Sequence, residues 1–316
     1  MRKFVVTVLA FVFVALFCSV CLDIIITKGL LRTDCYRYQT FSDIFKGNAK
    51  YDVLYMGNSR CFSHFNPLVI DSACNVNSYG LGLGGYAINA QISIYHCYKS
   101  HNMLPKLIVQ QVDFLTFQKS SDIRHQHDSE RFFTAVYDKA MRKELVKLGY
   151  GWGELYIPLY RYIGYQKVIK DGLLEFLHIK HYVERPAYKG FSPEKGQWDS
   201  HEADAMDSID ICFDEYAKKM FEDYLQECKK DNINVVLVNT PVYYKTLAKV
   251  KDYNEMTDYF ESISKKYGFD YLDYSNGYYI CYDSSFFSNT THLNSAAADI
   301  FSTDFAKDLK GYVNNR

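Results

Sequence analysis

The sequence predicts an α/β protein built on a parallel sheet of about five strands, with helices on both faces. Short runs rich in β-branched and aromatic residues recur, several of them end at glycine or proline, and helical periods lie between them. We expect strands at 51–56, 75–79, 106–112, 234–240 and 269–273, and helices at 87–99, 214–230, 253–267 and 295–309.

The composition is that of an ordered protein with a substantial core. Of the 316 residues, 48% are hydrophobic and 23% are charged. This length allows about two domains of ~150 residues, or one α/β domain with insertions. The 36 Lys and Arg residues against 37 Asp and Glu give a net charge of −1, which argues against nucleic acid as a partner.

The N-terminus carries a segment long enough to cross a membrane. Arg2 and Lys3 precede an uncharged run over residues 4–22, which spans about 29 Å as a helix. Because the positive end stays in the cytoplasm, the rest of the chain is expected outside it. We predict a signal-anchor and linker over 1–32 at the bacterial inner membrane, and the main domain over 33–316 in the periplasm. A cleaved signal peptide and a lipid anchor at Cys18 or Cys21 are the alternatives.

A long segment separates the third and fourth expected strands. It has about 120 residues, far more than one crossover requires. We expect an insertion at about 117–210, with helical patterns at 130–148 and 160–178 and a loop at 186–198. Over the carboxyl edge of the sheet, it would either shape a substrate groove or form a structural cap.

The motif Gly57-Asn58-Ser59-Arg60 directly follows the first expected strand. Sites in parallel sheets lie beyond the carboxyl ends of the strands, and a Ser at a strand-to-helix turn is lifted above the sheet edge. Ser59 is therefore a candidate nucleophile. The alternative is an ordinary helix N-cap, a position where Ser and Asn are common.

A glycine cluster, Gly80-Leu81-Gly82-Leu83-Gly84-Gly85, follows the second expected strand. It matches GxGxxG, but a dinucleotide site needs that motif after the first strand and an acidic residue about 20 positions later. No acidic residue lies between Gly80 and Lys106. We expect the bare N–H groups of this turn to face an oxyanion instead.

The third block, Asn289-Thr290-Thr291-His292-Leu293-Asn294, precedes the last expected helix. His292 lies in a loop rather than on an apolar face. At the same sheet edge as Ser59, it could take the proton from the Ser59 hydroxyl.

The three blocks, in this order and at strand ends, resemble the SGNH (GDSL-type) hydrolase superfamily over about residues 51–309. The most similar members are membrane-anchored periplasmic proteins that work beside membrane-bound O-acyltransferases, in alginate O-acetylation or in D-alanine transfer to teichoic acids. The resemblance implies a flavodoxin-like, three-layer α/β/α fold.

The resemblance also implies roles for individual residues. Ser59 would be the nucleophile that accepts an acyl group, and His292 would be its general base and then the acid for the leaving alkoxide. The N–H groups of Ser59 and of Gly85 or Gly84, in the loop that begins at Gly82, would hold the oxyanion. This chemistry requires no metal and no cofactor.

Arg60 and Asn58 are assigned to substrate binding, with a role in capping the turn left open for Arg60. A carboxylate-bearing sugar is the ligand that the arginine would suit.

Two positions depart from the superfamily's pattern. The Asp expected three residues before the His is Asn289, which can orient the imidazole but cannot stabilise its cation by charge. Asp283 is the candidate substitute, or the site is a Ser–His dyad. The Gly-x-Asn block after the third strand is replaced by Gln111-Val112-Asp113, and an ionised Asp113 cannot donate to an oxyanion.

No metal site is predicted. The nine cysteines show no ligand spacing in the part of the chain after the apolar segment. The cluster of His125, His127 and Asp128 is interpreted as solvated surface because it lies in a charged stretch.

These observations favour an extracytoplasmic, membrane-anchored serine esterase or O-acyltransferase that acts on a cell-surface polysaccharide. A membrane-bound O-acyltransferase is the expected protein partner. The alternative is a catalytically lapsed member of the same fold that binds glycan or assists an O-acylation system. Asn289 and Asp113 favour that alternative.

Overall fold

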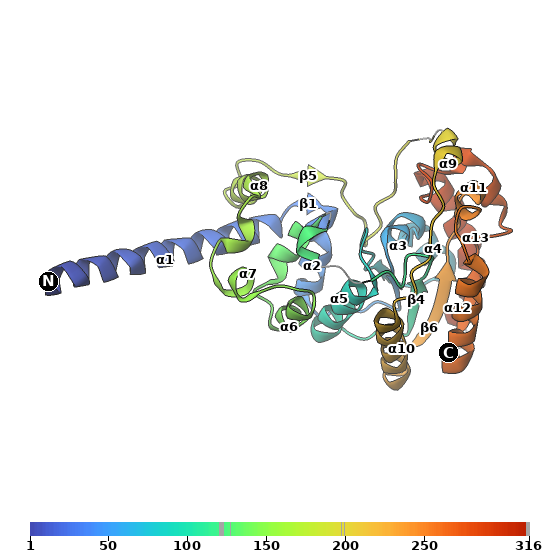
Figure 1. Ribbon diagram of the computed structural model, residues 1–316, viewed down its shortest axis with the longest axis horizontal. Helices are drawn as coiled ribbons and strands as arrows, with labels where there is room; N and C mark the ends of the chain where they lie inside the picture. The colour runs from blue at the N-terminus through green and yellow to red at the C-terminus, as the bar shows by residue number, and fades with distance from the viewer. Residues whose placement is uncertain (120–122, 127, 197, 199, 314–316) are drawn as a thin grey trace. The chain divides into compact units, whose positions relative to one another are not determined.

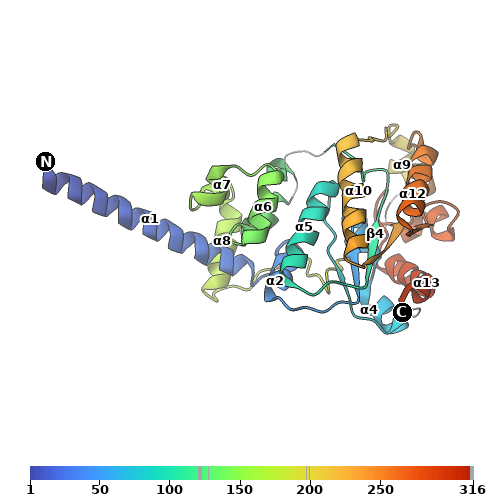
Figure 2. The ribbon, with the colours of Figure 1, turned by 90° about the horizontal axis from the view of Figure 1, so that it is seen from below.

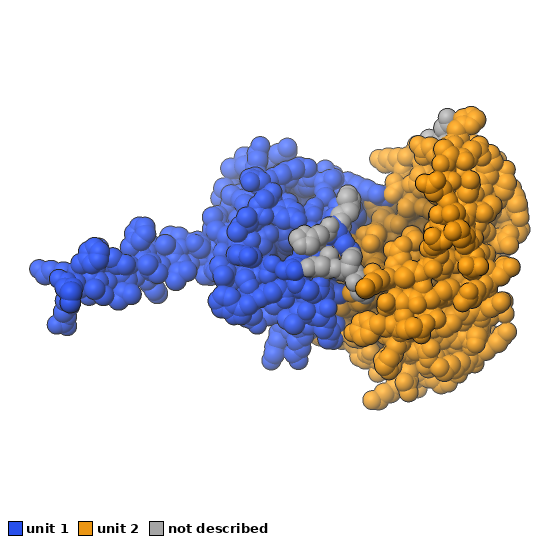
Figure 3. All heavy atoms as spheres, viewed as in Figure 1, with its two compact units in different colours: residues 1–46, 122–187 blue, residues 47–121, 188–316 orange. Residues whose placement is uncertain are grey.

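The computed structural model describes residues 1–119, 123–126, 128–196, 198 and 200–313. The chain divides into two compact units, which are coloured separately in Figure 3. Unit 1 comprises residues 1–46 and 122–187, and unit 2 comprises residues 47–121 and 188–316. The segment expected as one insertion at 117–210 therefore contributes to both units.

Unit 2 contains a five-stranded parallel sheet with the order β3-β2-β4-β6-β7 (Figure 1). In chain order of these strands the pattern is 2-1-3-4-5, which is the flavodoxin-like order. The α/β class and the five parallel strands predicted from the sequence are confirmed. The strands are β2 (Val53–Met56), β3 (Ser78–Gly80), β4 (Leu107–Gln111), β6 (Asn234–Asn239) and β7 (Asp270–Asp273).

Helices cover both faces of this sheet and give three layers (Figure 2). One face packs against α3 (Ser59–His64), α4 (Pro67–Cys74) and α13 (Ser295–Val313), and the other against α5 (Ile88–His101), α10 (Glu215–Lys230) and α12 (Tyr253–Tyr267). Alternate strand residues such as Tyr55, Val109 and Val236 are fully buried with Phe301 of α13. Strands buried on both faces explain the continuous apolar runs in the sequence.

The second strand starts later than the sequence indicated. Residues 75–77 follow α4, a helix that the sequence pattern did not reveal. Asn75 ends that helix in the left-handed conformation at φ 52°, and its N–H donates to the carbonyl of Asp71. Unit 2 also contains the short helices α9 (His201–Ala205) and α11 (Tyr244–Leu247), and the 3-10 turns η4 (Tyr279–Tyr282) and η5 (Ser284–Phe286).

Unit 1 is mainly helical, with one two-stranded parallel sheet of β1 (Asp34–Cys35) and β5 (Val183–Glu184). The expected helix at 130–148 is divided, because the Asp138 carboxylate caps a new helix by accepting from the N–H of Met141 at 2.7 Å. The expected helix at 160–178 is divided at Gly164, where φ is +89°. The elements are α1 (Arg2–Leu30), α2 (Tyr36–Lys46), η1 (Ile123–His125), η2 (Ser129–Ala135), α6 (Lys139–Lys147), α7 (Trp152–Tyr156), η3 (Tyr160–Tyr162) and α8 (Gln166–Phe176).

Helix α1 is long and apolar enough to span a membrane, and its most apolar 18-residue window is not buried against the protein. Its last third is different. Ile26 and Leu30 are fully buried in the core of unit 1 together with Phe133 and Tyr162. One helix is therefore both the apolar N-terminal segment and a core element of unit 1.

Candidate active site

The turn after β2 places Ser59 at the first residue of α3, beyond the carboxyl end of the sheet. This turn lies where the strand order reverses, between β2 and β4, which is the usual site position in such sheets. Gly57 is required there: its φ is +151°, and a Cβ would lie 2.6 Å from Oε1 of Gln111 and 2.9 Å from Cβ of Cys61. Asn58 caps α3 by accepting from the N–H of Arg60 at 3.0 Å.

Ser59 and His292 lie in direct contact although they are 233 positions apart in the chain. The Oγ of Ser59 is 2.6 Å from Nε2 of His292. His292 sits in the loop before α13, and a bridge between Phe287 and Leu293 closes this loop. The sequence-predicted pair is therefore brought together at hydrogen-bond distance.

The side chain of Asn289 fixes the orientation of the His292 ring. Its Oδ1 accepts from the backbone N–H groups of Thr291 and His292, both at 3.0 Å, and these donors identify which amide atom is the oxygen. The same Oδ1 lies 2.9 Å from Nδ1 of His292, so that nitrogen carries the proton and donates. Nε2 then remains an acceptor for the hydroxyl of Ser59.

Asp283 does not take the place of the expected aspartate. Its side chain is exposed and caps η5 by accepting from the N–H of Ser285 at 2.9 Å. The position beside Nδ1 of His292 belongs to Asn289. The suggested substitution by Asp283 is therefore corrected: the third member of the arrangement is the neutral amide.

Asp113 follows β4, is 1% exposed and bonds to residues of the turn that carries Ser59. Its carboxylate accepts from Nδ2 of Asn58 at 2.5 Å, from Nε of Arg60 at 3.2 Å and from Nε2 of Gln111 at 2.8 Å. Burial alone would raise the pKa of Asp113, but the positive charge of Arg60 and these hydrogen bonds hold it below its usual range. An ionised Asp113 accepts hydrogen bonds here and gives no donor to an oxyanion.

This arrangement corrects the expected roles of Arg60 and Asn58. Arg60 is 2% exposed; its guanidinium pairs with Asp113 at 2.5 Å and contacts the carbonyl of Thr240 at 3.4 Å. Asn58 uses its oxygen for the cap of α3 and its nitrogen for Asp113. Both residues hold the nucleophile turn rather than presenting polar groups to a substrate.

The glycine loop runs beside this turn. The N–H of Leu83 donates to the carbonyl of Gly57 at 2.9 Å, which extends the pairing of β2 and β3 past their ends. A Cβ on Gly84 would lie 3.7 Å from Cβ of Ser59, and a Cβ on Gly82 would lie 2.8 Å from the backbone nitrogen of Phe62. Gly85, at φ +75°, is exposed. The loop thus places peptide groups next to the Ser59 side chain.

His64 is a residue of the site that sequence reasoning missed. It is fully buried, and its Nε2 accepts from the N–H of Leu293, next to His292, at 3.1 Å. The two imidazole rings meet edge to face with centroids 6.2 Å apart. Burial, helped by the positive charge of Arg60 and by repulsion from His292 whenever that ring is protonated, holds the pKa of His64 well below its usual range. Its place at the end of α3, five residues after the nucleophile, was the available signal.

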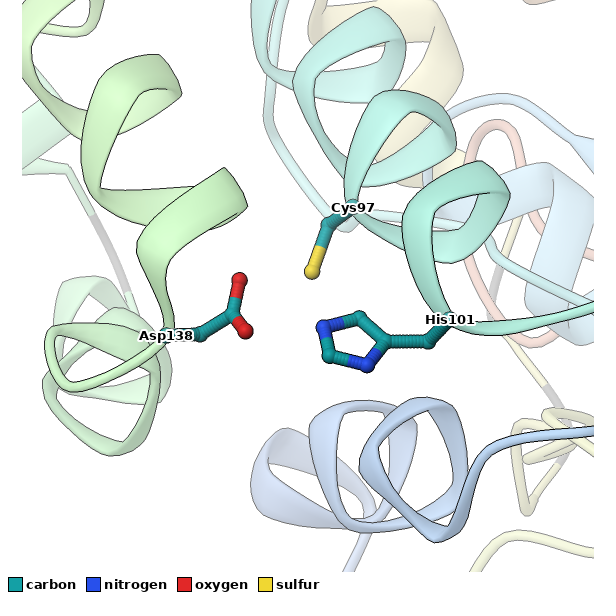
Figure 4. A group of neighbouring side chains, drawn as sticks. All are labelled: Cys97, His101 and Asp138. Atoms are coloured by element: carbon teal, nitrogen blue, oxygen red, sulfur yellow. The ribbon is translucent and has the colours of Figure 1, made fainter.

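Groups that could suggest a metal lie elsewhere. Asp128 is not solvated surface as expected, because it is 7% exposed and accepts from Arg37 at 3.1 Å in unit 1; His127 lies outside the described residues. Cys97 and His101 lie one turn apart on α5, as Figure 4 shows together with Asp138. Since Asp138 belongs to the other unit, we assign no metal site to these residues.

Comparison with known proteins gives limited similarity. No protein-family model and no curated protein matches the chain. A solved structure from Bacteroides fragilis, described as a "putative acylhydrolase", shares 12% identity over 87% of this chain and 96% of its own, with a TM-score of 0.39. One from Streptococcus pneumoniae, described as a "putative platelet activating factor", shares 10% identity over 98% of this chain and 99% of its own, with a TM-score of 0.41. At this level neither match assigns an activity to this chain.

Proposed function

We propose that this protein is a serine esterase or O-acyltransferase that works through an acyl-enzyme on Ser59. The observation that carries the proposal is the 2.6 Å contact between Oγ of Ser59 and Nε2 of His292. The contact between Asn289 and Nδ1 of the same ring makes Nε2 the basic nitrogen, as this chemistry needs.

The acyl transfer uses these side chains in two steps. His292 takes the proton of Ser59 while Oγ attacks the carbonyl carbon of the ester, and a tetrahedral oxyanion forms. When the carbon–oxygen bond to the leaving group breaks, His292 returns the proton to the departing alkoxide. Water or a sugar hydroxyl then attacks the acyl-enzyme with the same proton transfers in reverse order.

The oxyanion would be held by backbone N–H groups. The N–H of Ser59 at the start of α3 and those of Gly84 and Gly85 in the adjacent loop are the candidates. Two donors from backbone are sufficient for this role, so the site does not depend on a donor from the position of Asp113.

We propose that α1 is an uncleaved anchor and that both units lie outside the cytoplasm. Arg2 and Lys3 precede the apolar run, which supports that orientation. Loss of α1 would remove Ile26 and Leu30 from the core of unit 1. A Cβ on Gly29 would lie 1.8 Å from the carbonyl oxygen of Gly172, so α1 and α8 are in direct backbone contact. This packing favours retention over a cleaved signal peptide.

The acceptor that we propose is a cell-surface polysaccharide, with a membrane-bound O-acyltransferase as the source of the acyl group. Support for this assignment comes from the resemblance of the Ser, Gly and His blocks to anchored members of the SGNH superfamily. The arrangement of side chains is compatible with hydrolysis and with transfer, since they differ only in the second nucleophile.

The experiment is hydrolysis of p-nitrophenyl acetate by the full chain in detergent. Ser59→Ala and His292→Ala should each abolish turnover, whereas Ser72→Ala, an exposed serine of α4, should leave it unchanged. Turnover that survives Ser59→Ala would contradict the proposal. Absence of turnover in the wild-type protein, together with glycan binding, would instead support the catalytically lapsed alternative.

A further inference from the structure

Unit 1 exposes a cluster of large apolar side chains on one segment, residues 152–163. Trp152 is 70% exposed, Tyr156 53% and Ile163 72%, and Ile157 and Tyr160 are also exposed. The rings of Trp152 and Tyr156 lie 6.0 Å apart, and a Cβ on Gly153 would lie 3.0 Å from the ring of Tyr160. These contacts hold the three aromatic side chains on one short segment, and we call the exposed apolar residues of 152–163 the aromatic patch.

Hydrogen bonds join the segment that carries the aromatic patch to α1 at one position along that helix, Asp23. Asp23, the residue directly after the uncharged run at 4–22, is fully buried. Its carboxylate accepts from the N–H of Leu159 at 2.6 Å, from Nη1 of Arg161 at 2.9 Å and from the hydroxyl of Tyr137 at 2.6 Å. Two of these donors belong to the same segment as the patch. In both views α7 lies on the side of unit 1 from which α1 extends (Figures 1 and 2).

We propose that the aromatic patch lies in the lipid headgroup region of the membrane that α1 crosses. This inference rests on the proposed anchoring role of α1. If residues 4–22 fill the hydrocarbon core, Asp23 marks its outer boundary, and the segment bonded to Asp23 lies at the interface. Trp and Tyr are the side chains that favour this zone, because each has an apolar body and a polar group.

The net positive charge of unit 1 is compatible with a position at the membrane surface. Without Arg2 and Lys3, which precede the apolar run and lie on the other side of the membrane, it carries 15 Lys and Arg residues against 12 Asp and Glu, whereas unit 2 carries 19 against 25. A basic unit next to the anchor is attracted to anionic lipid headgroups. The patch and the anchor together give unit 1 two independent attachments to one bilayer.

The two tryptophans of the chain allow a direct test in liposomes that contain anionic lipid. Trp198→Phe leaves Trp152 as the only tryptophan, and Trp152→Phe leaves Trp198, which belongs to unit 2. Lipids brominated near the headgroup end of the acyl chain should quench most of the Trp152 emission. Lipids brominated near the chain terminus should quench it less.

Two further variants, in the chain with both tryptophans changed to Phe, separate the patch from the anchor. Phe13→Trp reports on the middle of α1 and should be quenched most by the deep bromines. Leu177→Trp is the matched control: Leu177 is 58% exposed in unit 1, but its neighbour Phe176 packs against Arg32. Arg32 follows the end of α1 at Leu30, which lies about 10 Å beyond Asp23 along the helix. Leu177→Trp should escape quenching.

The outcomes are distinct. Quenching of Phe13→Trp without quenching of Trp152 would overturn the interfacial position while the anchor stands, and it would leave a membrane protein partner as the occupant of the patch. Absence of quenching at both positions would overturn the anchor and the inference together, without bearing on the chemistry of Ser59. Equal quenching of Trp152 and Leu177→Trp would overturn the assigned depth.

Discussion

A buried arginine–aspartate pair lies in each unit, Arg60–Asp113 in unit 2 and Arg161–Asp23 in unit 1, and these two pairs have different consequences. Arg60 and Asp113 in unit 2 are 2% and 1% exposed, and Arg161 and Asp23 in unit 1 are 5% and 0% exposed. Asp113 collects donors from the turn that carries Ser59, whereas Asp23 collects donors that tie α1 to the segment 137–161. The same chemistry thus holds the turn that carries Ser59 in one unit and the C-terminal part of the apolar helix α1 in the other.

A buried ion pair contributes little net stability but is costly to break. Removing one partner leaves an uncompensated buried charge. In the intact pair, the attraction between the two charges roughly balances the cost of taking them out of water. The structural effect of a broken pair should therefore be similar in both units. The functional effect should differ, because Ser59, His292 and Asn289 all belong to unit 2.

The largest effect is expected from Arg60→Met. It leaves Asp113 buried without its cation, so the free energy of unfolding should fall by about 3–5 kcal/mol. Turnover should also fall on the order of 100-fold, because the turn that positions Ser59 loses its support. Denaturant unfolding and p-nitrophenyl acetate hydrolysis measure the two effects. A folded variant with full turnover would show that the pair does not position the nucleophile.

Arg161→Met breaks the corresponding pair in unit 1. We expect a similar destabilisation of about 3–5 kcal/mol, with turnover per folded molecule unchanged. The double variant Asp23→Leu/Arg161→Met should recover part of the lost stability, since it removes both charges. A loss of turnover equal to that of Arg60→Met would contradict the functional difference between the two pairs.

Asn289→Asp tests the neutral third member of the site. An aspartate could accept the same three hydrogen bonds and would add a negative charge 2.9 Å from Nδ1 of His292. Stabilising the imidazolium by about 1.4 kcal/mol would raise the rate about tenfold. The acid limb of the pH–rate profile should also move to higher pH. Unchanged kinetics across the pH range would indicate that His292 does not become cationic in the rate-limiting step.

The smallest effect is expected from His64→Gln, whose side-chain oxygen can still accept from Leu293. Because the pKa of His64 is lowered in the folded protein, the unfolded chain binds a proton first as pH falls below about 6.5. Wild-type stability should therefore decline below that pH by up to about 1.4 kcal/mol per unit from this residue. The variant should show a flatter stability profile between pH 7 and 5, with turnover at pH 7 little changed. Parallel profiles would contradict a neutral, buried His64.

Much of the architecture and part of the site could be predicted from the sequence. The α/β class follows from strand-like apolar runs and from the helical periods between them. Both are local patterns, so they can be recognised without knowing which distant residues are in contact. Ser59 and His292 were singled out because their blocks occur at strand ends. Their approach to 2.6 Å depends on the folding of a chain segment that separates them by 233 positions, which no local pattern specifies.

The roles of Asn58, Arg60 and Asp113 could not be read from the sequence for the same reason. A polar side chain beside a nucleophile has the same local signature whether it faces a substrate or a buried carboxylate 53 residues away. Likewise, the pairing of Asp23 with Arg161 joins positions 138 apart, so Asp23 reads only as an interruption of an apolar helix. Helix α4 was missed because its eight residues are too few to establish a helical period.

The most direct test of the central claim is to identify the atom that receives the acyl group. The full chain in detergent is mixed with p-nitrophenyl acetate, quenched within the first turnover, digested and analysed by mass spectrometry. We predict one added acetyl group on the peptide that contains Ser59, and none on that peptide in Ser59→Ala or His292→Ala. Turnover without acetylated Ser59, or acetylation confined to another residue, would contradict the proposed acyl-enzyme.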